Sequence, residues 1–298
     1  MDTDFFTKFP FSLPIDLHAI DESIREFSVR HDAFFSGIKS GLNGIITGIQ
    51  AVLNILPWWL LLILVLLAGW KLSGKLKSGI LYSAMMSLIG LFGLWNMMNE
   101  TLAIIITSVL ISLLFGLPIG ILISGSERAN RIVRPILDTM QTMPVFVYLI
   151  PAVLFFGLGK APAVIATVIY AIVPVIRLTS NGIRQVDREV VEAARAFGST
   201  RLQTLVKVQI PQALPTIMTG INQTIMMAMA MVVTCSMIGA TGLGMEVLIG
   251  VNRLEIGRGL IAGISVVIMA IVIDRLTQSG IAASEQTAKR QSKRRWRK

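Results

Sequence analysis

Residues 179–215 read TSNGIRQVDREVVEAARAFGSTRLQTLVKVQIPQALP, a polar segment between two strongly apolar stretches. Asp187 can accept hydrogen bonds from the free backbone N–H groups that begin a helix. Gly198 suits the left-handed position that ends many helices, and the Ser-Thr pair after it can begin another. The segment is therefore predicted to form a helix, a sharp turn and a second helix that runs to Pro211 or Pro215.

Most of the chain around this segment is apolar. Of its 298 residues, 54% are hydrophobic and 15% are charged, with a mean hydropathy of +0.72, whereas soluble domains carry about 25% charged residues. A helix needs about 20 apolar residues to cross the hydrocarbon core of a membrane. An all-α polytopic membrane protein is therefore predicted, with about seven transmembrane helices near residues 55–72, 79–98, 101–123, 142–158, 161–178, 215–239 and 259–275.

The placement of Lys and Arg predicts the orientation of these spans, because cytoplasmic loops carry an excess of both residues. Basic residues follow the first, third, fifth and seventh spans, and the intervening loops are poorer in them. The N-terminus is therefore expected outside the membrane and the C-terminus in the cytoplasm. Before the C-terminal tail, the residues that support this orientation are Lys71, Lys75, Lys77, Arg128, Arg131, Arg134, Arg184, Arg188, Arg195, Arg201 and Lys207.

The two ends of the chain are predicted to lie outside the spans. Residues 1–54 are expected to be an N-terminal extracytoplasmic or interfacial extension, with an interfacial helix over residues 33–54. An eighth crossing is the alternative for that helix, and it would place the N-terminus inside. Residues 277–298 are a basic tail, which behind a membrane domain is expected to meet anionic membrane lipid. No sequence pattern favours nucleic acid as a partner.

One motif in the quoted segment resembles a known family. Glu192-Ala193-Ala194 is followed, after three residues, by Gly198 and, after nine more, by a Val-x-Ile triplet that precedes Pro211. This pattern resembles the EAA loop of type I ABC-importer permeases, in which Ile and Leu usually occupy the two aliphatic positions. The match is specific, because five fixed or near-fixed positions fall within a stretch of 20 residues. This stretch lies in the loop that the charges place in the cytoplasm.

The resemblance extends beyond the loop. Residues 213–244 resemble the subgroup that imports glycine betaine, choline and related quaternary amines, and GLPIG at 116–120 resembles a glycine–proline step of these permeases. The resemblance implies a type I permease core over residues 99–276, with the coupling loop at residues 179–213. Residues 55–98 would then be accessory transmembrane helices.

The resemblance also implies a role for the loop and a set of partners. In such permeases the short helix fits a groove on the ATPase subunit and transmits its closure to the membrane helices. One chain carries one such loop, so two ATPase subunits imply a second copy of this permease, together with an extracytoplasmic substrate-binding protein. The residues expected to dock on the ATPase are Glu192, Ala193, Ala194, Gly198 and Pro211.

The chain has no convincing nucleotide site of its own. Gly69 to Lys75 matches the glycine and lysine spacing of a phosphate loop, but Leu76 replaces the required Ser or Thr. The chain is therefore expected to be a non-catalytic subunit that binds no cofactor, with ATP and Mg²⁺ held by the partner ATPase.

Polar residues inside the sixth predicted span suggest where the substrate passes. Three consecutive polar residues interrupt the hydrophobic run, and a methionine-rich stretch follows them. Buried amides in membrane helices either bond across helices or line a pathway, and flexible methionines can form a gate. Helix packing is the alternative for each of these residues. The candidate path residues are Asn222, Gln223, Thr224, Met227 and Met231.

Three alternative functions have less support from the sequence. An ion-coupled secondary transporter usually binds its ion with charged groups at mid-span, whereas Glu100 and Asp274 lie near span ends. A membrane enzyme needs a catalytic constellation, and none is present. Cys235, His18 and His31 have no partners at a recurrent metal-ligand spacing, so no metal site is expected. The same permease fold with another small solute, such as an amino acid or an oxyanion, stays open.

Overall fold

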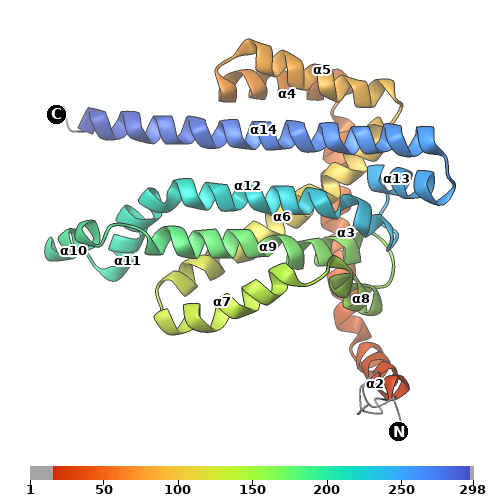
Figure 1. Cartoon of the computed structure of the whole chain (residues 1–298), viewed down its shortest axis with the longest axis horizontal. Helices are drawn as coiled ribbons and strands as arrows, with labels where there is room; N and C mark the ends of the chain where they lie inside the picture. The colour runs from red at the N-terminus through yellow and green to blue at the C-terminus, as the bar shows by residue number, and fades with distance from the viewer. Residues whose placement is uncertain (1–15, 296–298) are drawn as a thin grey trace, which may run out of the picture.

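The computed structural model describes the backbone of residues 16–295 and side chains as far as residue 281. Over these residues the chain is a series of helices without strands (Figure 1). The helices are α2 (Leu17–Arg30), α3 (Asp32–Ile55), α4 (Trp58–Ser73), α5 (Leu76–Leu91), α6 (Trp95–Ser124), α7 (Glu127–Thr142), α8 (Val145–Phe156), α9 (Lys160–Arg184), α10 (Arg188–Ala196), α11 (Arg201–Thr204), the π-helical turn η1 (Leu205–Gln209), α12 (Ile210–Ser236), α13 (Leu243–Asn252) and α14 (Ile256–Arg295). The predicted all-α class is confirmed.

The centre of the molecule is made by α9, which packs against α6 and against α12. Glycines allow the helices to approach closely, as is typical of transmembrane contacts. A Cβ added at Gly120 of α6 would lie 2.7 Å from Thr179 Cβ and 2.9 Å from the carbonyl oxygen of Ile176 on α9. A Cβ at Gly220 of α12 would lie 3.0 Å from Leu178 Cβ. The glycines thus fix the distances between the three central helices.

Fewer helices are long and apolar enough to count as candidate spans than the seven predicted. Four helices are long and apolar enough to cross a membrane, or six if two sharply bent pairs each count as one span. The pairs are α3 with α4, bent by 94°, and α7 with α8, bent by 95°. α8 has only 12 residues, about 18 Å at 1.5 Å per residue, so the span predicted at 142–158 is not a single straight helix.

Two predicted helix ends are wrong. The second helix of the polar segment does not stop at Pro211 or Pro215 but continues through η1 and α12 as one 36-residue helix to Ser236. Pro211 lies inside this continuous helix, just after the π-helical turn. The missing proline N–H removes a hydrogen bond there, and the π-helical turn adjusts the backbone spacing around it. Earlier in the chain, α5 ends at Leu91 and α6 begins at Trp95, so the second span ends at Leu91 rather than at residue 98.

The predicted helix over residues 33–54 is present as α3. It runs across the direction of α9, α12 and α14, with α2 at its N-terminal end (Figure 1). Its inner face packs on α6, α9 and α8, and Ile46 is buried there. The crosswise course fits an interfacial helix better than an eighth crossing, but its position relative to a membrane stays a prediction.

The basic connections gather at one end of the molecule. The turn between α4 and α5, the turn between α6 and α7, the α10–α11 segment and the C-terminal end of α14 all lie toward the left of Figure 1. This arrangement agrees with a shared side for the basic loops. The side of the membrane that they face stays a prediction, and the side chains of residues 282–298 lie outside the described part of the tail.

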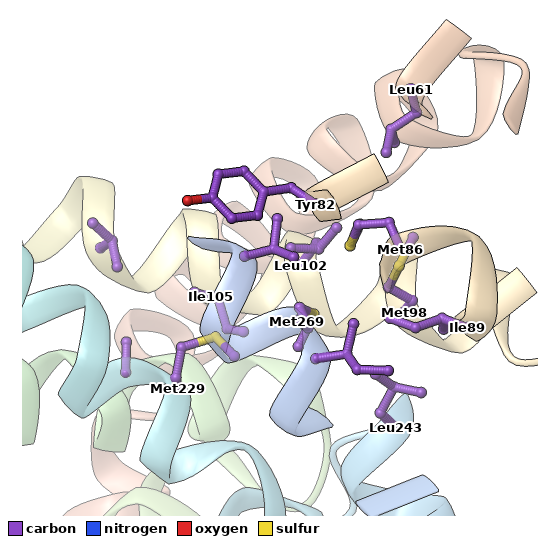
Figure 2. Close-up of a cluster of buried hydrophobic side chains, with 14 of the residues drawn as sticks. Leu61, Tyr82, Met86, Ile89, Met98, Leu102, Ile105, Met229, Leu243 and Met269 are labelled. Carbon is purple, nitrogen blue, oxygen red and sulfur yellow. The ribbon is translucent and has the colours of Figure 1, made fainter. Parts of the chain in front are cut away.

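A methionine-rich core joins α4 and α5 to the central helices. Figure 2 shows Met86 of α5, Met98 of α6, Met229 of α12 and Met269 of α14 within one buried cluster. Flexible thioether side chains fill irregular gaps between helices. The residues predicted as accessory helices therefore share a core with the permease helices, and the N-terminal half is packed into the same unit.

Candidate functional site

The polar segment forms the predicted helix, turn and helix at the end of the molecule that carries the basic connections. The Asp187 side chain accepts from the Glu189 N–H at 2.9 Å and caps α10. The chain then turns at Gly198, whose φ of +86° is the left-handed conformation that glycine adopts without strain. Thr200 and Gln203 form a reciprocal capping box at the start of α11.

The motif residues lie on a free surface. None of the residues of α10 is buried, and Glu192 and Ala193 are exposed while Ala194 is half-buried. Gly198 and Pro211 are also exposed. Figure 1 shows α10 and α11 at the far end of α9 and α12, beyond the body of the bundle. Glu192, Ala193, Ala194 and Gly198 thus lie on one projecting element, whereas Pro211 lies in the first turn of α12; their docking role stays a prediction.

An apolar surface on the same element was missed in the sequence. Phe197 is 92% exposed, Leu202 is 69% exposed and Val206 is 52% exposed. We call these three residues the coupling patch. Large apolar side chains gathered on a polar projecting segment mark an interaction site. The signal in the sequence was a phenylalanine directly before the helix-ending glycine, in a helix too short to bury it.

The candidate path residues do not share one surface. Successive residues of a helix are separated by about 100°, so three in a row cannot face the same way. Asn222 points to α14, where its Nδ2 donates to Asp274 Oδ1 at 3.2 Å. Gln278 Nε2 donates to the same carboxylate at 2.8 Å. Asn222 therefore bonds across two helices, which is the alternative to a path-lining role that the sequence left open.

Of the remaining candidates, three are packed inside the bundle and one is exposed. Thr224 and Met231 are buried, and Met227 packs against the methionine-rich cluster. Met231 borders a cavity of about 10 Å³, which is room for about one water molecule. Gln223 instead is exposed. It lies on a stripe of α12 that we call the open stripe, made of Thr219, Gln223, Met226 and Ala230.

At the opposite end of the bundle a polar network ties together four segments. Lys160 of α9 lies 3.3 Å from Glu100 of α6 and donates to Gln50 of α3 at 3.0 Å. Thr241, in the connection after α12, donates to the Glu100 carboxylate. Part-buried charges are stabilised only when their hydrogen-bonding groups are satisfied. The network therefore holds α3 against the ends of the central helices.

The geometry describes a membrane bundle with a projecting docking element, and comparison with known proteins agrees. Residues 112–279 match the family of binding-protein-dependent transport system inner membrane components. The chain belongs to this family. Over 265 residues it is 47% identical to the glycine betaine transport system permease protein OpuAB of Bacillus subtilis, covering 87% of this chain and 92% of that protein. It is 43% identical to the glycine betaine/proline betaine permease ProW of Escherichia coli, covering 88% and 73%.

Solved structures place this family member among ABC importers. The inward-facing MetNI methionine ABC transporter aligns with a TM-score of 0.55 and 25% identity, covering 69% of this chain and 98% of the solved chain. An amino acid ABC transporter aligns with a TM-score of 0.54 at 21% identity and shares the fold. The protein is therefore a multi-pass inner-membrane permease subunit of an ABC importer.

Proposed function

We propose that this permease imports glycine betaine and related quaternary amines. The observation that carries the proposal is the close similarity to permeases whose names specify this cargo, at 47% identity for OpuAB and 47% for the glycine betaine/carnitine permease GbuB of Listeria monocytogenes. Aromatic faces usually hold a quaternary ammonium group through cation–π attraction. In this proposal an extracytoplasmic binding protein supplies these aromatic faces and captures the solute. The permease then needs to offer only a weak passage, from which the solute can leave.

The proposed assembly contains two copies of the permease and two ATPase subunits. Each projecting segment docks on one ATPase, with the coupling patch and Ala193 entering its groove and Glu192 meeting a donor at the rim. The ATPase binds ATP and Mg²⁺ and hydrolyses the ATP. The N-terminus would lie outside and the C-terminus in the cytoplasm, where the basic tail of residues 277–298 meets anionic lipid.

Uptake into proteoliposomes tests the proposed cargo and its energy source. The permease, its ATPase and its binding protein would be reconstituted together, with radiolabelled glycine betaine, choline or methionine outside. ATP inside the vesicles is expected to drive glycine betaine uptake, and an ionophore is expected to leave the uptake unchanged. Uptake that needs an ion gradient but no ATP would favour a secondary transporter. Uptake of methionine alone would contradict the quaternary-amine cargo.

The proposed homodimer places the open stripe of α12 against the translocation path. Polar groups within membrane helices avoid lipid and face a protein interior or a water-filled cavity, so the exposed Gln223 is expected to face the second copy. The chain has a single cysteine, which allows a clean test. In a Cys235→Ser background, Gln223→Cys is expected to give a cross-linked dimer with a short bifunctional maleimide.

Leu114→Cys is the control for this cross-link. Leu114 is 67% exposed and lies beside Leu110 and Phe115 on an apolar face of α6, which is expected to meet lipid. It should give little cross-linked dimer in the same membranes. A strong cross-linked product from Leu114→Cys with none from Gln223→Cys would contradict the proposed dimer contact on α12 and would place it on α6.

A further inference from the structure

Charged side chains lie along the contact between α7, which the sequence placed between two predicted spans, and α9, which overlaps the span predicted at 161–178. We call this contact the α7–α9 groove. Arg177 of α9 pairs with Asp138 of α7 and donates to Gln141 Oε1 at 2.6 Å. Seven residues further along α9, Arg184 pairs with Glu127 at the start of α7. The two helices therefore lie antiparallel, as Figure 1 also shows.

The inner charged pair of this groove lies just inside one edge of the expected membrane span, the edge nearer α10. Arg177 follows the start of α9 at Lys160 by 17 residues, about 25 Å at 1.5 Å per residue, and the hydrocarbon core is about 30 Å thick. Charged side chains at such depth face the protein or a water-filled cavity rather than lipid. The α7–α9 groove is thus expected to be a water-filled vestibule open toward the end that carries α10.

A small polar pocket opens within the groove. Its volume is about 20 Å³, and its polar lining comes from Asn130, Arg134, Arg177, Ser180 and Asn181. Ser180 is only 3% exposed, and its Oγ has no hydrogen-bond partner among the described residues. A buried hydroxyl without a partner is costly. The pocket therefore presents an unused donor beside two guanidinium groups.

The chemistry of this lining fits the anionic group of a carboxylate. Guanidinium groups bind carboxylates through paired, charge-assisted hydrogen bonds. Arg134 is exposed and makes no ion pair within the described residues, so its charge is free for a ligand. A pocket with room for one or two water molecules admits a carboxylate but not a trimethylammonium group, which would stay in the open groove.

We infer that this pocket is an exit subsite that holds the carboxylate of a zwitterionic substrate on its way to the cytoplasm. The inference rests on the proposed import of betaines and narrows it to solutes that carry a carboxylate. Arg134, Arg177 and Arg184 outnumber Asp138 and Glu127 along the groove, so a cation without a carboxylate, such as choline, is disfavoured by its own charge.

Thermal unfolding of the purified permease–ATPase complex in nanodiscs tests the subsite without transport. Glycine betaine, sodium acetate, choline chloride and inorganic phosphate would be added at equal millimolar concentration and matched ionic strength. Glycine betaine and acetate are expected to raise the unfolding midpoint by about 3 °C, and choline is expected to leave it unchanged. Arg134→Gln and Ser180→Ala should each weaken the apparent affinity for glycine betaine about tenfold.

Arg128→Gln is the matched control, because Arg128 is an exposed arginine of the same helix outside the pocket lining. It should bind glycine betaine as the native complex does. Equal weakening in Arg128→Gln and Arg134→Gln would overturn the inference, as would a shift with choline equal to that with glycine betaine. A shift with phosphate alone would overturn it in favour of a lipid-phosphate site.

Failure of the subsite and failure of the proposed cargo are separable. Native proteoliposomes that import glycine betaine, combined with no loss of binding in Arg134→Gln, would reject the subsite alone. Native proteoliposomes that import no betaine would reject the cargo, whatever the unfolding midpoints show.

Discussion

Phe197→Ala is expected to weaken association of the permease with its ATPase roughly 100-fold and to reduce uptake accordingly. Phe197 is 92% exposed at the tip of the projecting segment, and truncating a large apolar anchor at the centre of an interface typically costs about 2–4 kcal/mol. The measurement is the binding constant between permease in nanodiscs and soluble ATPase, followed by ATP-driven uptake. The fold should be unaffected, because the side chain has little to pack against within the chain.

Phe34→Ala is the control for this experiment. Phe34 is a phenylalanine of α3 that is 64% exposed, and α3 lies toward the end of the bundle opposite α10 (Figure 1). Its removal should leave ATPase binding unchanged. Glu192→Arg is expected to act at the same step as Phe197→Ala by reversing a charge in the docking surface. Normal co-purification of the ATPase with both Phe197→Ala and Glu192→Arg would show that the projecting segment is not the docking element.

Gly120→Val is expected to prevent formation of a stable folded permease. The added side chain would have to occupy space already taken by Thr179 Cβ at 2.7 Å and the Ile176 carbonyl at 2.9 Å. Overpacking costs about 1–3 kcal/mol even where neighbours can shift, and the backbone of α9 cannot. Close packing is a main force between helices in a membrane. The measurement is the yield of monodisperse protein after extraction, together with its unfolding midpoint.

Gly263→Val provides a matched change in α14. A Cβ at Gly263 would meet nothing within 4 Å, so the same substitution should leave the yield of monodisperse protein near that of the native chain. Gly120→Ala should fall between the two. Equal yields for Gly120→Val and Gly263→Val would mean that α6 and α9 are not in close contact.

The sequence supported the membrane class and the helix, turn and helix after Asp187 for clear physical reasons. Long apolar runs have few alternatives to spanning helices, and the capping residues Asp187, Gly198 and Thr200 act locally, so their effects can be recognised without the fold. The local signal for the bend before α8 was also present, but it was interpreted as a kink within one short span. Pro144 disfavours helix in the preceding residue, and α7 ends at Thr142.

The pathway and the α7–α9 groove could not be derived in the same way. Average hydropathy does not reveal which face of α12 is covered by α9 or α14, so Asn222 and Gln223 looked equivalent. The pairing of Arg177 with Asp138 joins residues 39 positions apart. Such a contact depends on how α7 folds back along α9, and neither charge alone predicts it.

The unbroken helix from Arg201 to Ser236 has a mechanical consequence. Its 36 residues correspond to a rod of about 54 Å, with the coupling patch near one end and the open stripe along its length. A tilt of about 10° around the middle of such a rod displaces each end by about 5 Å in opposite directions. A small rotation imposed at the coupling patch would therefore move the opposite end of this helix by several ångströms without unfolding any part of it.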